Sequence, residues 1–123
     1  MSPRSEEFAA EARDRLAAAH HSIDAGDFGV AVGTAYYAML YAARAALSER
    51  DLNAKTHGGT WTLFGEQFVK DGTIDQPLAA KARDTERLRY EADYDAADIA
   101  SEVAEAVVAD AEKFVSAVLA ALD

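Results

Sequence analysis

The chain has 123 residues, enough for one domain with a single core and too few for two independent ones. Half of the residues are hydrophobic and 28% are charged, which is typical of a folded globular protein. A formal net charge of −10 disfavours non-specific binding along a phosphate backbone, because Lys and Arg drive that binding. The absence of cysteine excludes disulfides and thiolate metal sites.

The N-terminal residues include no apolar stretch of the signal-peptide kind. No run elsewhere reaches the roughly 18 apolar residues that a bilayer-spanning helix needs. We therefore expect a cytoplasmic protein with no membrane partner.

Apolar residues at three- and four-residue steps predict two long helices, over residues 5–25 and 28–50. Gly26 should end the first helix, and Asp27 is expected to cap the second. A row of alanines on the second helix would let another helix approach closely, either from within the chain or from a second copy. The row consists of Ala31, Ala35, Ala38, Ala42 and Ala45.

Three further helices are predicted, over residues 61–70, 77–92 and 96–122. Thr56 or Thr60 is expected to cap the first of these, and Pro77 suits the first turn of the next. No segment alternates apolar and polar residues as a half-buried strand would. The sequence therefore predicts an all-α, up-and-down antiparallel bundle of about five helices, forming a single domain over residues 1–123.

Polar and aromatic residues are concentrated in "RLRYEADYD", residues 87–95. On a helix, one face of this region would carry Arg83, Arg87, Tyr90 and Tyr94. A neighbouring face would carry Arg89 and Asp93. Such a surface can hold a phosphate or stack on a base. The structural alternative is a helix end held by Arg–carboxylate pairs, with half-buried tyrosine rings.

His57, in "KTHGGTW", is the only histidine predicted to lie in a loop. It is a candidate for acid–base chemistry or ligand contact, or else it satisfies a polar group at a helix junction. Tyr37, Tyr41 and Arg44 form another polar row, which either contributes to the same groove as Arg89 or packs at an interface.

His20 and Asp24 have the spacing of a metal-binding pair, but a solvated helix end explains them equally well. We therefore expect neither a metal site nor a cofactor.

Three segments together resemble the HEPN superfamily (higher eukaryotes and prokaryotes nucleotide-binding), in its small stand-alone prokaryotic branch. They are "TAYYAMLYAARAAL", "KTHGGTWTLFGEQFVKDGTI" and "LRYEADYD", and the resemblance spans residues 8–114. It implies a helical bundle that commonly forms a homodimer, with polar residues of the penultimate helix lining a cleft between the two protomers. It also implies pairing with a minimal nucleotidyltransferase in a toxin–antitoxin-like system, where a tyrosine matching Tyr94 receives a nucleotide.

Ribonuclease members of this superfamily carry an Arg followed after four to six residues by a His, and the pair cleaves RNA without a metal. After Arg89, the corresponding positions hold Tyr94, Asp95 and Ala96, so the expected His is missing. Cleavage would then need another proton acceptor, either Asp93 or, if the fold brings it close, His57.

Three hypotheses follow. The first is a dimeric module with a degenerate ribonuclease motif that binds a nucleotide, RNA or partner protein. Its site would be lined by Arg89, Tyr94, Arg87, Arg83, Tyr90 and Tyr37. The second is an active ribonuclease toxin that uses Arg89 with Asp93 or His57. The third is a purely structural helical bundle.

Overall fold

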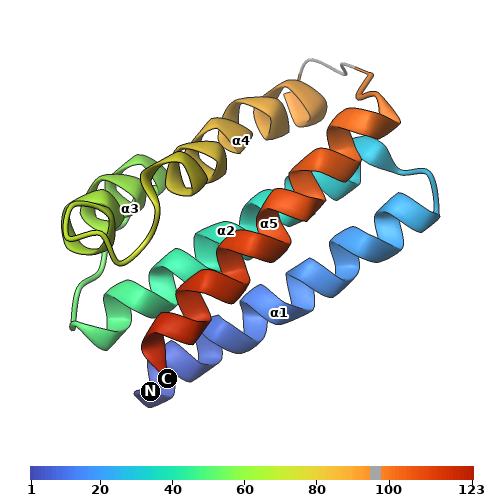
Figure 1. Cartoon of the computed structure of the whole chain (residues 1–123). Helices are drawn as coiled ribbons and strands as arrows, with labels where there is room; N and C mark the ends of the chain where they lie inside the picture. Colours follow the sequence, from blue (N-terminus) through green and yellow to red (C-terminus); the bar gives the residue numbers. More distant parts are fainter. Residues whose placement is uncertain (95–97) are drawn as a thin grey trace.

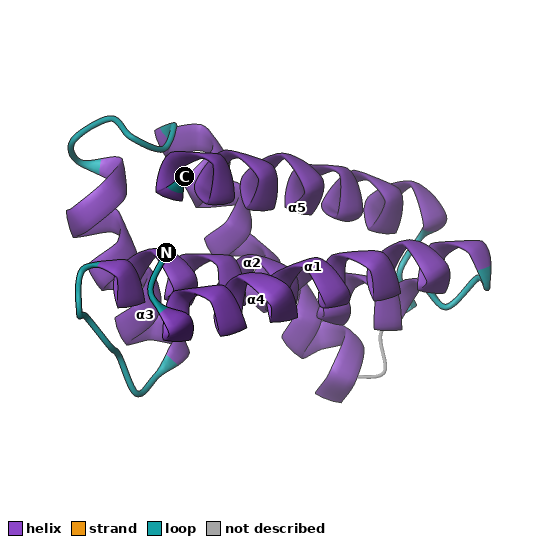
Figure 2. Cartoon of the chain, turned by 90° about the horizontal axis from the view of Figure 1, so that it is seen from below, coloured by secondary structure: helices purple, strands orange, loops and turns teal. Residues whose placement is uncertain are grey.

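The computed structural model describes residues 1–94 and 98–123, and within these ranges every regular element is a helix (Figures 1 and 2). The elements are α1 (Pro3–Asp24), α2 (Phe28–Glu49), α3 (His57–Phe64), the π-helical turn η1 (Gly65–Val69), α4 (Gln76–Tyr94) and α5 (Ser101–Leu122). The four long helices lie side by side, and the two termini meet at one end of the bundle (Figure 1). The predicted all-α bundle of five helices is confirmed.

The pairing of α1 with α2 explains the alanine row. Gly26, with φ of +79°, makes the turn between the two helices in a backbone conformation that favours glycine. All five alanines of the row are fully buried. The hydroxyl of Ser5 on α1 donates to the carbonyl of Ala45 at 3.0 Å, so α1 is a helix that packs on this row. Asp27 stands at the predicted cap position, although its side chain makes no capping hydrogen bond.

Aromatic rings join α5 to the short helix α3 in the core. The ring centroid of Phe114 lies 5.9 Å from that of Trp61 and 5.5 Å from that of Phe64. All three side chains are buried. This cluster fixes α3 against the bundle and thereby positions the residues at its N-terminal end.

One predicted helix start is wrong, and another falls outside the described residues. α3 begins at His57 instead of Trp61, because the Thr56 side chain caps it and accepts from the Gly59 amide at 2.9 Å. His57 is therefore the first residue of a helix and does not lie in a loop. α5 begins at Ser101, because the preceding Ala100 is extended, with ψ of 145°. The predicted start at residue 96 lies outside the described residues.

Two glycines of α2 face α4. A Cβ atom at Gly29 would stand 3.6 Å from the Cβ of Ala92, and one at Gly33 would stand 3.5 Å from the Cγ of Arg89. Both distances are ordinary van der Waals contacts, and Arg89 reaches the side of α2 at the level of Gly33. In the described ranges, no helix is both long and apolar enough to cross a membrane.

Candidate functional site

Arg89 extends from α4 towards α2 and lies against two adjacent tyrosine rings. Its Cζ atom is 5.6 Å from the ring centroids of both Tyr36 and Tyr37, within cation–π range. Its Nη1 donates to Oδ2 of Asp93 at 3.4 Å, which confirms that these two residues share a helix face. The Nε atom is buried and has no acceptor among the described residues. Packing against the two rings therefore holds the guanidinium in place.

The Arg89 guanidinium stays protonated in this environment. Burial alone would lower the pKa of Arg89, but Tyr37 and Asp93 more than compensate and raise the pKa above its ordinary value. The side chain is only 11% exposed, so its attraction for an anion is screened less than that of a surface arginine.

Tyr36 is the polar centre of the site, although its side chain is fully buried. Its Oη accepts a hydrogen bond from Nε1 of Trp61 at 3.1 Å and lies 3.3 Å from Nδ1 of His57. Burial raises the pKa of Tyr36 to about 12, so the hydroxyl stays protonated at neutral pH.

His57 is held through one ring nitrogen. Its Nδ1 lies 3.3 Å from Oη of Tyr36 and 3.6 Å from Oε1 of Glu86, while Nε2 has no partner in the described part of the chain. Nε2 is therefore the ring nitrogen that stays open to a ligand. The side chain is 30% exposed, so a solvent-borne ligand can reach it.

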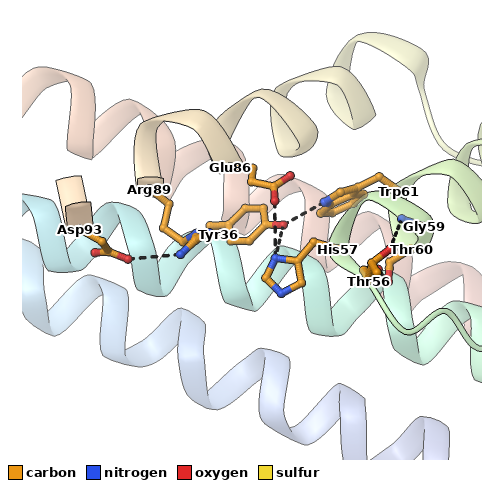
Figure 3. Close-up of polar contacts among 9 residues, drawn as sticks. All are labelled: Tyr36, Thr56, His57, Gly59, Thr60, Trp61, Glu86, Arg89 and Asp93. Atoms are coloured by element: carbon orange, nitrogen blue, oxygen red, sulfur yellow. Dashed lines mark hydrogen bonds and ion pairs between the residues drawn. The ribbon is translucent and has the colours of Figure 1, made fainter. Parts of the chain in front are cut away.

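Arg89 and His57 thus meet at the same pair of tyrosines, as Figure 3 shows for Tyr36. The ring centroid of His57 is 5.7 Å from that of Tyr36 and 5.8 Å from that of Tyr37. We call Arg89, His57, Tyr36, Tyr37 and Glu86 the Arg89–His57 site. Asp93 lies on the far side of Arg89 from His57 (Figure 3).

The other predicted residues lie on the exposed side of α4. A shallow depression of about 850 Å³ follows this helix, and Arg83, Arg87 and Tyr90 contribute to its lining. Arg87 pairs with Glu91 at 3.7 Å and is 85% exposed. The rings of Tyr90 and Tyr94 lie 4.7 Å apart and are 54% and 67% exposed. The alternative of half-buried rings is therefore wrong for these two tyrosines.

His20 belongs to a different contact. Its Nε2 lies 2.9 Å from Oε2 of Glu112 and links α1 to α5. Among the described residues, no three His, Asp or Glu side chains gather closely enough to hold a metal ion.

Comparison with known proteins identifies the family. A model of the HEPN domain matches residues 5–121, almost the whole chain. This chain is a HEPN-domain protein. The resemblance seen in its three segments is confirmed.

Relatives of this HEPN protein span most of its length. It is 34% identical to the UPF0332 protein glr0978 of Gloeobacter violaceus, over 93% of this chain and 92% of that one. It is also 34% identical to a Methanocaldococcus jannaschii protein named "Putative toxin MJ0605", over 90% of this chain and 83% of that one. The crystal structure of TT1696 from Thermus thermophilus has the same fold, with a TM-score of 0.82 and 20% identity. That match covers 98% of this chain and 99% of the other.

Sequence reasoning missed part of the site. Tyr36 and Trp61 were not among the predicted site residues, yet in the structure Nε1 of Trp61 donates to Oη of Tyr36. Glu86 was not singled out at all. One signal was available: Glu86 precedes Arg89 by three residues, so the two side chains lie near one side of α4 in the HEPN protein.

Proposed function

We propose that this HEPN protein is a toxin-type ribonuclease that binds single-stranded RNA at the Arg89–His57 site. One observation carries the proposal: a charged arginine and a histidine whose Nε2 contacts no described residue lie against the same two tyrosines. Cleavage of a phosphodiester needs a cation for the phosphate and an acceptor for the ribose proton. The names of relatives such as "Putative toxin MJ0605" agree with a toxin-like role.

In this proposal His57, from a different helix, takes the role of the histidine that is missing from the family motif. Arg89 holds the scissile phosphate, and Nε2 of His57 takes the proton of the ribose 2′-hydroxyl. The 2′ oxygen bonds to phosphorus while the bond to the 5′ oxygen breaks, and the 5′ oxygen takes a proton from water. Glu86 and Tyr36 orient the imidazole through Nδ1, as a third group orients the base in other nucleophilic sites.

Asp93 suits the role of proton acceptor less well than His57 does. Its Oδ2 faces the Arg89 guanidinium at 3.4 Å, so a proton taken up there would weaken the ion pair. We assign Asp93 the task of orienting Arg89.

The first test is RNA binding by Arg89→Ala. We expect its affinity for a labelled single-stranded RNA to fall by about tenfold or more, because a charge-assisted contact to phosphate is lost. Fluorescence anisotropy measures the change. Arg13→Ala is the matched control, since Arg13 is exposed on α1 and forms no ion pair in the described ranges. Unchanged affinity with a lowered melting temperature would instead support the purely structural bundle.

A second candidate function is binding without cleavage. It is favoured by the absence of His at the family's motif positions after Arg89. In this candidate function the protein is a homodimer that binds a nucleotide, an RNA end or a nucleotidyltransferase partner. Sedimentation of the purified protein would test whether it is a dimer. RNA that binds and remains intact would select this candidate.

The proposed nucleotidyltransferase partner has a natural target on α4. Tyr94 is 67% exposed, the most open of the large hydrophobic side chains in the described ranges. We expect incubation with such a partner and ATP to add a nucleotidyl group at Tyr94, detected as a mass increase and lost in Tyr94→Phe. Modification of Tyr90 instead, or no mass increase with an active transferase, would contradict this assignment.

A further inference from the structure

We propose that bound RNA continues beyond the Arg89–His57 site along a strip of arginines and tyrosines on α1 and α2. The Arg–Tyr strip consists of Tyr37, Tyr41 and Arg44 on α2, and Arg15 on α1. The inference rests on the proposed function and adds the path of its substrate.

The strip is continuous because each tyrosine lies between two guanidinium groups. Cζ of Arg89 is 5.6 Å from the centroid of Tyr37, and Cζ of Arg15 is 5.7 Å from that same centroid. Arg15 also stands 5.5 Å from the centroid of Tyr41, and Arg44 stands 6.0 Å from it. Cations and rings therefore alternate from the candidate active site to Arg44.

The charge of the strip is only partly balanced. Arg15 pairs with Glu11 at 2.9 Å, and Arg89 pairs with Asp93 at 3.4 Å. Arg44 forms no ion pair with any residue in the described ranges, and its Nε is buried without an acceptor. A partly buried guanidinium without a counter-ion is costly, and a bound phosphate would offset that cost.

The form of the strip suits single-stranded RNA. Tyr37, Tyr41 and Arg44 follow one another at steps of four and three residues on one side of α2, over about 10 Å. All three are half-buried, so their side chains are held in place while part of each stays open. Single-stranded nucleic acid is bound by this combination of cations for the backbone and rings for the bases. A second copy of this chain docked through the same strip would place its arginines against the arginines of the first copy.

The test compares short and long RNA with the full chain. For a ten-nucleotide RNA, we expect Arg44→Ala to lower the affinity about tenfold. The slope of log affinity against log salt should fall in magnitude by about 0.7, as for one lost phosphate contact on a single strand. The affinity for a dinucleotide should stay unchanged. Arg13→Ala, which removes one positive charge elsewhere on α1, should match wild type in both affinity and slope. If Arg44→Ala does not fold, Arg44→Gln retains much of the aliphatic part of the side chain and tests removal of the same charge.

Several outcomes separate this path from the proposed function. If Arg89→Ala weakens binding of both RNAs while the Arg44 variants match wild type, the path is wrong and the function stands. If wild type binds neither RNA, the proposed function fails and the path fails with it. If Arg44→Ala leaves RNA affinity unchanged and alters the sedimentation coefficient, the strip is an interface between copies, which also overturns the path.

Discussion

RNA cleavage by this HEPN protein is expected to fall by about 10²- to 10⁴-fold when His57 is replaced by alanine, the usual contribution of a general base. Nε2 of His57 is the proposed acceptor of the ribose proton, and its Nδ1 is already held by Tyr36 and Glu86. Single-turnover cleavage of a labelled RNA by purified protein measures the rate. Binding of the same RNA should change little, because Arg89 and Tyr37 remain in place.

Two comparisons make the His57 result specific. His21→Ala removes an exposed histidine from α1 and should cleave at the wild-type rate. Free imidazole should restore part of the activity of His57→Ala, since it supplies the same proton acceptor to the vacated space. Full activity of His57→Ala together with a large loss in Asp93→Asn would transfer the role of base to Asp93 and refute our assignment.

Replacement of Tyr36 by alanine is expected to lower the free energy of unfolding by about 3–5 kcal/mol, as for other large-to-small changes at buried aromatic residues. The ring is fully buried and contacts Trp61, His57 and Tyr37. Its loss would also leave Nε1 of Trp61 without its acceptor. Tyr36→Phe removes the hydroxyl alone and should cost about 1–3 kcal/mol. Urea unfolding at pH 7 compares the two variants, and equal costs would show that burial of the ring contributes nothing beyond its hydroxyl.

The same hydroxyl predicts how stability depends on alkaline pH. The pKa of Tyr36 is raised from 10.0 to about 12 in the folded protein. Below pH 10 the side chain is protonated in both states and contributes no pH dependence. Between pH 10 and pH 12 the unfolded chain loses the proton first, so stability falls as pH rises through this window.

Tyr36→Phe should therefore lose less stability between pH 9 and pH 11.5 than wild type does. Tyr41→Phe serves as the control, because Tyr41 is half-buried and keeps the titration of Tyr36 intact. An equal alkaline loss in wild type and Tyr36→Phe would show that burial of this hydroxyl does not set the pH dependence.

Helix order and type followed from local signals that act over a few residues. The apolar steps and Gly26 predicted α1 and α2, and Pro77 marked the first turn of α4. The start of α3 was misjudged because Thr56 and Thr60 were both acceptable caps by their side chains alone. In the structure Thr56 is the cap, so α3 begins at His57, one turn earlier than predicted.

Within the candidate site, the pairing of Arg89 with Asp93 was predictable, because a step of four residues on one helix brings them together. The missing histidine after Arg89 was likewise a property of the sequence. The sequence did not predict that His57 lies near Arg89, because no local signal relates the start of α3 to the middle of α4. Glu86 escaped notice because an exposed-looking acid on a polar helix has no distinguishing pattern.

For this protein, the sequence by itself determined the helices, the family and the arginine at the motif, because periodicity, turns and motif residues are local properties. Only the tertiary structure decided that His57 and Arg89 share two tyrosines, that Tyr36 is buried with a raised pKa, and that Arg44 lacks a counter-ion in the described ranges. The physical reason is that burial and charge balance depend on which helices pack together. In this fold the buried alanines of α2 pack against α1, and Gly29 and Gly33 face α4.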